Sequence, residues 1–171
     1  MPHPLLTQDM IDTYQRDGVI VIRGLFKEHV ETLRKGVARN MEEPGPFASE
    51  NKKEGETGRF FDDYCNWQRI EEFAEVIEKS PAAEVAADLM KSDRVQFFHD
   101  HVLVKEPGTP KPTPWHQDGP YYFVNGRQTI SFWSPATIVD APPAAPTRSK
   151  SVEDRGPSFG DETQPRPSIQ V

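Results

Sequence analysis

The feature that most constrains this chain of 171 residues is a change of pattern near residue 92. Before that point, apolar residues recur every three or four positions, which is the spacing of one buried face of a helix. After it, β-branched and aromatic residues form runs that are separated by prolines, a pattern typical of strands and loops. Helices followed by strands in one chain predict an α+β fold.

The helical part has recognisable start and stop signals. Residues 8–17 are predicted to form a helix, because Thr7 is a good N-cap residue and Gly18 stands where helices usually stop. A second amphipathic helix is expected to end before Pro44, and Ser80 followed by Pro81 predicts the N-cap and first turn of another. The apolar faces of the later helices are Val30, Leu33 and Val37; Trp67, Ile70, Phe73, Ala74 and Ile77; and Val85, Leu89 and Met90.

Four stretches have the composition of extended chain. Residues 19–22 are a short β-branched run that predicts a buried strand, and an extended stretch is expected to begin at residues 59–61, after a polar loop over 44–58. Residues 94–105 predict a long strand and residues 128–133 a further one. Five prolines between residues 107 and 120 exclude a helix from the segment between these two strands.

Composition limits the classes of function that the chain can have. A net charge of -7 without a long basic run argues against nucleic acid or an anionic membrane surface as a partner, and leaves a small-molecule substrate as the expected one. A single cysteine and the lack of an apolar span or signal segment predict a cytoplasmic protein. Residues 1–140 are expected to form one domain, and residues 141–171 a disordered Pro-rich tail.

The strongest chemical signal lies in the Pro-rich connection, where His116 and Asp118 flank Gln117. In an extended backbone, side chains two residues apart point the same way, so the imidazole and the carboxylate can converge on one metal ion. One nitrogen and one oxygen ligand suit Fe(II) in a site with two histidines and one carboxylate. Without context, such a tripeptide is a weak signal, and a hydrogen-bonded surface pair is its more frequent explanation.

The sequence around this pair resembles the phytanoyl-CoA dioxygenase family. The resemblance is carried by residues 98–109, by residues 113–118 (Thr-Pro-Trp-His-Gln-Asp) and by residues 127–133, and upstream by residues 17–26, 63–67 and 80–83. It covers about residues 5–140. The fold that it implies is a set of N-terminal helices followed by the first half of a double-stranded β-helix, a jelly roll that is incomplete in this chain.

The resemblance also implies an activity and a set of site residues. The activity is that of an Fe(II)- and 2-oxoglutarate-dependent dioxygenase, in which hydroxylation of an unactivated carbon is coupled to the conversion of 2-oxoglutarate to succinate and carbon dioxide. His116 and Asp118 would be two of the three metal ligands, and Lys105 and Trp133 would line the cosubstrate pocket. An exposed strand-end lysine and a core aromatic are the structural alternatives for the last two residues.

The sequence departs from the family pattern after residue 140. Family members supply a second histidine and then an arginine from late strands, whereas no histidine follows His116 here. Arg148, Arg155 and Arg166 lie in the tail without a strand pattern, and none of them is assigned a role. The missing ligand would come from His99, His101, solvent or another chain.

Two other readings of the sequence stay open. The first is a truncated, non-catalytic fragment that binds a partner protein through an unpaired sheet edge. The second is a metal-binding jelly roll without oxidative chemistry. His99 and His101 alternate along the expected strand, so they suggest either a second metal pair or histidines that line a substrate pocket.

Overall fold

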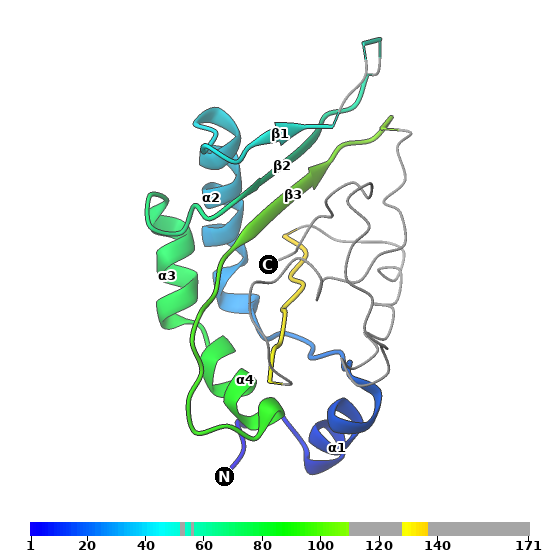
Figure 1. The fold of residues 1–171 in the computed structure, drawn as a ribbon, viewed down its shortest axis with the longest axis vertical. Coiled ribbons are helices and arrows are strands. Elements are labelled where there is room, and N and C mark those ends of the chain that lie inside the picture. Colours follow the sequence, from blue (N-terminus) through cyan, green and yellow to red (C-terminus); the bar gives the residue numbers. More distant parts are fainter. Residues whose placement is uncertain (52–53, 56, 110–127, 137–171) are drawn as a thin grey trace, which may run out of the picture.

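The chain is described by a computed structural model that covers residues 1–51, 54–55, 57–109 and 128–136. Within these residues four helices and a small antiparallel sheet confirm the predicted α+β class (Figure 1). The elements in order are α1 (Gln8–Asp17), the 3-10 turn η1 (Lys27–His29), α2 (Val30–Glu42), β1 (Ser49–Glu50), β2 (Phe60–Tyr64), α3 (Glu71–Lys79), α4 (Ala82–Met90) and β3 (His101–Lys105). None of the helices in the described ranges is long and apolar enough to cross a membrane.

Helix α1 begins and ends where its sequence signals predict. The Thr7 hydroxyl accepts a hydrogen bond from the Met10 amide at 3.2 Å, which satisfies one of the amides left over at the helix start. At the other end Gly18 takes a left-handed conformation (φ 76°) and donates its amide to the Tyr14 carbonyl. Glycine adopts this conformation without steric cost, so the helix stops there.

The first hydrophobic core joins α1 to α4. Its buried members are Leu6, Ile11, Leu25, Val85 and Leu89. Gln15 of α1 donates its side-chain amide to the Leu89 carbonyl of α4, which fixes the two helices relative to each other. This cluster also receives apolar side chains from residues 19–26 and 128–136, so it ties both ends of the described chain together.

The three strands form a sheet in the order β1-β2-β3, and neighbouring strands are antiparallel. In the β2–β3 pair, Phe60 lies opposite Lys105 and Tyr64 opposite His101. Because side chains alternate between the faces of a strand, Phe61, Val102 and Val104 share one face. That face packs against α2 and α3 as the second core, together with Ile70 and Phe73 (Figure 1).

Helices α2 and α3 approach closely at a glycine. A Cβ atom at Gly36 would lie 2.5 Å from Cε1 of Phe73, well inside ordinary contact distance. The absence of a side chain at Gly36 therefore lets the Phe73 ring of α3 rest directly on the backbone of α2. This contact sets the platform on which β2 and β3 lie.

Two predicted strands are wrong. Residues 19–22 and 128–133 are extended but carry no strand in the structure, because their backbones do not enter the β1-β2-β3 ladder. Each instead packs one side on the first core: Ile20 and Ile22 face it, while Val21 is 73% exposed. The composition of these segments predicted apolar burial, but burial of one side does not by itself create a strand.

Two further predictions need correction. The strand expected over residues 94–105 is confined to His101–Lys105, and Phe97 and Phe98 before it are exposed. Ser80 is not an N-cap: it ends α3, Pro81 takes the N-cap position of α4, and no side-chain hydrogen bond caps that helix.

The jelly roll stays a prediction. The boundary at residue 140 and the tail 141–171 lie outside the described residues.

Candidate functional site

The two predicted metal ligands, His116 and Asp118, lie outside the described residues. Among the residues that are described, no group of three or more histidine, cysteine, aspartate or glutamate side chains is placed to hold a metal ion. The described part of the chain therefore offers no competing metal centre. The His99 and His101 pair in particular has no third ligand there.

Lys105 lies at the end of β3, on the sheet face that points away from α2 and α3. Its side chain is exposed, and its ammonium lies 5.3 Å from the centre of the Phe60 ring on the paired strand. A cation over an aromatic face is weakly attracted to it, so Phe60 favours one position of the flexible lysine side chain. Leu103 and His101 lie on the same face as Lys105, because alternate residues of a strand point the same way.

Trp133 is found in a different environment. Residues 128–136 are anchored by three hydrogen bonds to helical side chains or carbonyls: Gln128 to the Met90 carbonyl, Tyr14 to the Thr129 carbonyl and Arg34 to the Ala136 carbonyl. Phe132 packs edge-on against Phe26, and Trp133 points to the other side with 41% of its surface exposed. It is not a core aromatic, which was the structural alternative for this residue.

The same sheet face that carries Lys105 buries a histidine. His101 is only 4% exposed, and within the described structure neither of its ring nitrogens has a hydrogen-bond partner. The nearest carboxylate oxygen, from Asp62 on β2, is 3.8 Å from Nε2, which is beyond hydrogen-bond distance. The sequence singled out His101 through its alternation with His99, but its burial without a partner depends on tertiary packing and could not be predicted.

Burial determines the charge state of this histidine. Desolvation by burial, together with a smaller effect of the neighbouring His99, lowers the pKa of His101 from its ordinary 6.5 to about 3. The pKa of His99 is lowered by its own burial, against the pull of Asp100. His101 is therefore neutral at pH 7, and its separation from Asp62 is not an ion pair. A neutral imidazole has one N–H donor and one acceptor nitrogen.

The start of β3 is held in place by the buried carboxylate of Asp100. It accepts hydrogen bonds from the Asn66 amide, at 3.0 and 3.1 Å, and from the Trp67 amide at 3.0 Å. Burial raises the pKa of Asp100, while these amide hydrogen bonds lower it. The turn after β2 and the first residue of β3 are thus fixed together, and His101 with them.

A second buried carboxylate, Asp63, lies on the helix-facing side. It accepts hydrogen bonds from the Asn40 side chain at 2.8 Å and from the Gly45 amide at 2.7 Å, and Arg69 lies 3.7 Å away. A Cβ atom at Gly45 would lie 2.2 Å from the side-chain oxygen of Asn66, so only glycine fits there. This network joins α2, β2 and the turn before α3, and its role is structural.

Cys65 is the one cysteine of the chain and is exposed. Partial burial raises the pKa of its thiol, and the negative charges of Asp100 and Asp63 raise it further. A raised pKa keeps the thiol protonated at neutral pH and lowers its reactivity. The chemistry of this residue therefore does not point to a nucleophile.

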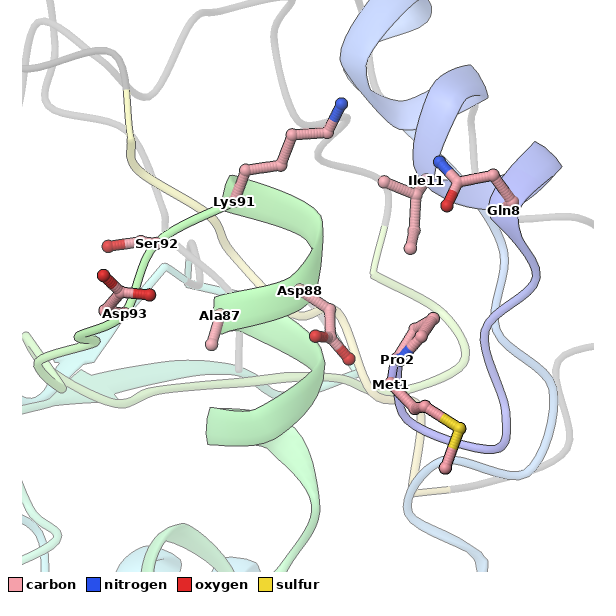
Figure 2. Close-up of a pocket in the computed structure, with 9 residues that line it drawn as sticks. All are labelled: Met1, Pro2, Gln8, Ile11, Ala87, Asp88, Lys91, Ser92 and Asp93. Atoms are coloured by element: carbon pink, nitrogen blue, oxygen red, sulfur yellow. The ribbon is translucent and has the colours of Figure 1, made fainter.

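An open hollow of about 340 Å³ lies between the N-terminal arm, α1 and α4 (Figure 2). Asp88 is the only acid of α4 that lines it, and its carboxylate accepts a hydrogen bond from the His3 amide at 2.6 Å. The carboxylate of Asp88 is therefore already hydrogen-bonded to the N-terminal arm. None of the residues predicted for the metal or cosubstrate site lines the hollow.

The described domain has helices α2 and α3 packed on one face of an antiparallel sheet, with His101 and Lys105 on the other. Comparison with family models identifies the family: the model of phytanoyl-CoA dioxygenase (PhyH) matches residues 14–143. The chain belongs to the phytanoyl-CoA dioxygenase family, a family of dioxygenases. Neither the comparison with curated proteins nor that with solved structures returns a match.

Proposed function

We propose that residues 1–140 form an Fe(II)- and 2-oxoglutarate-dependent hydroxylase domain that acts on a small molecule. The observation that carries this proposal is the His116-Gln117-Asp118 tripeptide, in a chain that belongs to the phytanoyl-CoA dioxygenase family. The sheet of β1, β2 and β3 would then be part of a jelly roll, with the reaction on the face opposite α2 and α3. The tail 141–171 would lie outside this domain.

His116 and Asp118 would hold the metal through one imidazole nitrogen and one carboxylate oxygen, a donor set that suits Fe(II). Fe(II) and 2-oxoglutarate, when bound, would supply the oxidising chemistry with dioxygen, of which one oxygen atom enters the substrate as a hydroxyl and the other enters succinate, with release of carbon dioxide. The third protein ligand would come from His99 or another chain, because no histidine follows His116. The protein itself would contribute the ligand positions and a site shielded from water.

Lys105 would bind a carboxylate of 2-oxoglutarate. Its side chain is exposed at the end of β3, and its ammonium lies 5.3 Å from the centre of the Phe60 ring, a contact that restrains the stem. A charge-assisted hydrogen bond from an ammonium to a carboxylate is about twice as strong as a neutral one. Trp133, with 41% of its surface exposed, would contact the cosubstrate through its ring.

The metal assignment is tested by titrating the purified chain with Fe(II) in the absence of air. Wild type is expected to bind one Fe(II), and the visible absorption of its complex is expected to change when 2-oxoglutarate is added. His116→Ala is expected to lose Fe(II) binding, whereas His29→Ala, a histidine of the η1 turn, is the matched control and should bind normally. Unchanged affinity in His116→Ala would refute the assignment.

A second candidate function is binding of a partner protein without catalysis. The sequence favours it in one respect, because the second histidine of the ligand set is not supplied after His116. In that case the sheet would pair with strands of another chain. A folded chain that binds no Fe(II), but forms a stable complex with a longer member of its own family, would support this candidate over the first.

A further inference from the structure

The buried imidazole of His101 is the one feature of the described sheet that the proposed function does not use. Its Nδ1 and Nε2 atoms are both enclosed, and no described residue hydrogen-bonds to either. Leaving a buried donor and acceptor without partners costs folding free energy, so native proteins rarely keep such groups without a reason. A ligand that pairs with both nitrogens is one such reason.

Aromatic rings lead from the surface to this imidazole. The Tyr64 ring lies edge-on to His101, with 5.9 Å between centroids, and is stacked on Phe47 at 4.9 Å. Phe47 is 49% exposed, whereas His101 is 4% exposed, so the row runs from solvent to the interior of the sheet face. Flat apolar groups pack well against such rings.

The imidazole is also held in a fixed place. It lies opposite Tyr64 in the β2–β3 ladder, and the adjacent Asp100 ties the start of β3 to the turn after β2. A fixed group loses little conformational entropy when it binds a ligand, which favours selective recognition. Its two ring nitrogens, both without a described partner, complement a group that both donates and accepts a hydrogen bond, such as a hydroxyl or an amide.

We propose that His101 is the polar recognition group of the substrate site, where it hydrogen-bonds a hydroxyl or amide of a small molecule whose flat apolar part lies against Tyr64 and Phe47. This inference rests on the proposed function, because it takes the sheet face of Lys105 as the side on which the reaction occurs. His101 and Lys105 are four residues apart on one strand, about 13 Å along β3, so substrate and cosubstrate can bind side by side on this face.

The test uses the full chain without added metal and two probes of nearly equal size, phenol and toluene. Phenol presents a hydroxyl where toluene has a methyl group, so the ratio of their affinities isolates polar recognition from apolar packing. Binding is followed by NMR titration with a ¹³C- or ¹⁵N-labelled histidine ring as the reporter. The wild-type chain is expected to bind phenol about tenfold more tightly than toluene, the effect of one net hydrogen bond.

Three variants decide the source of this preference. His101→Phe keeps the volume of the ring and is expected to remove the preference for phenol, and His101→Gln, which restores a donor and an acceptor, is expected to recover part of it. His29→Phe is the matched control and should leave the ratio unchanged. Equal affinities in wild type, or a preference that persists in His101→Phe, would overturn the proposal and leave an internal water as the partner of the ring.

The outcome is independent of the test of the proposed function. Phenol binding requires neither Fe(II) nor 2-oxoglutarate, so loss of recognition with succinate formation intact would overturn the role of His101 alone. Recognition that depends on His101, in a chain that forms no succinate, would instead overturn the dioxygenase proposal and keep the binding site.

Discussion

Buried polar groups on the two faces of the β2–β3 pair differ in their hydrogen bonding. On the face toward α2 and α3, the carboxylate of Asp63 accepts hydrogen bonds from Asn40 and Gly45. On the opposite face, His101 is buried almost as completely, yet neither ring nitrogen has a partner within the described structure. The strands, the register and the backbone pairing are common to both faces.

We infer from this difference that the helix-facing side of the sheet stabilises the fold, whereas the opposite side serves binding. The helix-facing side is completed by the chain itself, because Phe61 and Val102 fill the second core and Asp63 joins three elements. The opposite side carries His101, whose ring nitrogens have no described hydrogen-bond partner, and the exposed side chain of Lys105. Substitutions on the two faces should therefore affect different properties, stability on the first and binding on the second.

The largest effect is expected from Phe61→Ala on the helix-facing side. The ring is 1% exposed, and removing it leaves a cavity in the second core, which should lower the free energy of unfolding by about 3–5 kcal/mol. Lys105→Ala on the opposite face is the control, with an expected loss below about 1 kcal/mol. Urea denaturation measures both, and equal losses would remove the distinction between the faces.

The next largest effect is a dependence of stability on pH. The pKa of His101 is lowered to about 3 in the folded state, so between pH 6.5 and 3 the unfolded chain binds a proton that the folded chain does not. Above pH 6.5 the ring is neutral in both the folded and the unfolded chain, so it does not reduce stability. As pH falls below 6.5, the free energy of unfolding decreases by up to about 1.4 kcal/mol per pH unit.

Other groups around His101 also titrate in this window, so the pH effect is read as a difference between variants. His99, with a lowered pKa, acts in the same direction, whereas Asp100, with a raised pKa, acts in the opposite one, and Asp62 lies beside the ring. Comparing wild type with His101→Phe by urea denaturation at pH 7.5, 6 and 5 cancels these contributions. The variant should show the flatter profile, and parallel profiles would contradict the neutral buried state of His101.

A smaller effect, confined to binding, is expected from Lys105→Met. The substitution keeps an unbranched apolar stem beside Phe60 and removes the ammonium. If Lys105 binds a carboxylate of 2-oxoglutarate, the affinity for this cosubstrate should fall about 10- to 100-fold, with the thermal midpoint nearly unchanged. Isothermal titration of the Fe(II)-loaded chain gives the affinity. A midpoint that drops while the affinity holds would assign Lys105 a structural role instead.

The smallest effect has the opposite sign. At pH 7.5, His101→Phe removes two buried polar atoms without partners and should raise the free energy of unfolding by about 1–2 kcal/mol. A residue that lowers stability in the native chain is typical of a binding site, where function opposes stability. A loss of stability in this variant would indicate that the imidazole is needed by the fold.

Local signals in the sequence were sufficient to predict the helices. Thr7 and Gly18 bound α1 as predicted, and the second helix ends before Pro44, because capping and glycine conformation act over a few residues. Ser80 was assigned wrongly, since the choice between ending α3 and starting α4 depends on how the two helices pack. The strands over 19–22 and 128–133 were wrong because strand formation requires a paired neighbour, which lies far away in the sequence.

For the candidate site, the sequence identified the residues that can carry the chemistry, but not the burial and hydrogen bonding of their side chains. His101 and Lys105 were each singled out in the sequence, and the structure places both on one face of the sheet. The unpartnered burial of His101 arises from the register of β2 and β3 and from the turn that Asp100 holds, neither of which a single sequence reveals. The prediction for His116 and Asp118 lies outside the described residues and remains a prediction.

Measuring succinate tests whether the chain acts as an Fe(II)- and 2-oxoglutarate-dependent dioxygenase. The purified chain is loaded with Fe(II) and 2-oxoglutarate in the absence of air and then exposed to oxygen, with His116→Ala as the parallel control. The proposed function predicts succinate from wild type and none above background from the variant. Equal succinate from both, or none from a wild-type chain whose folded state is verified by its cooperative urea transition, would contradict it.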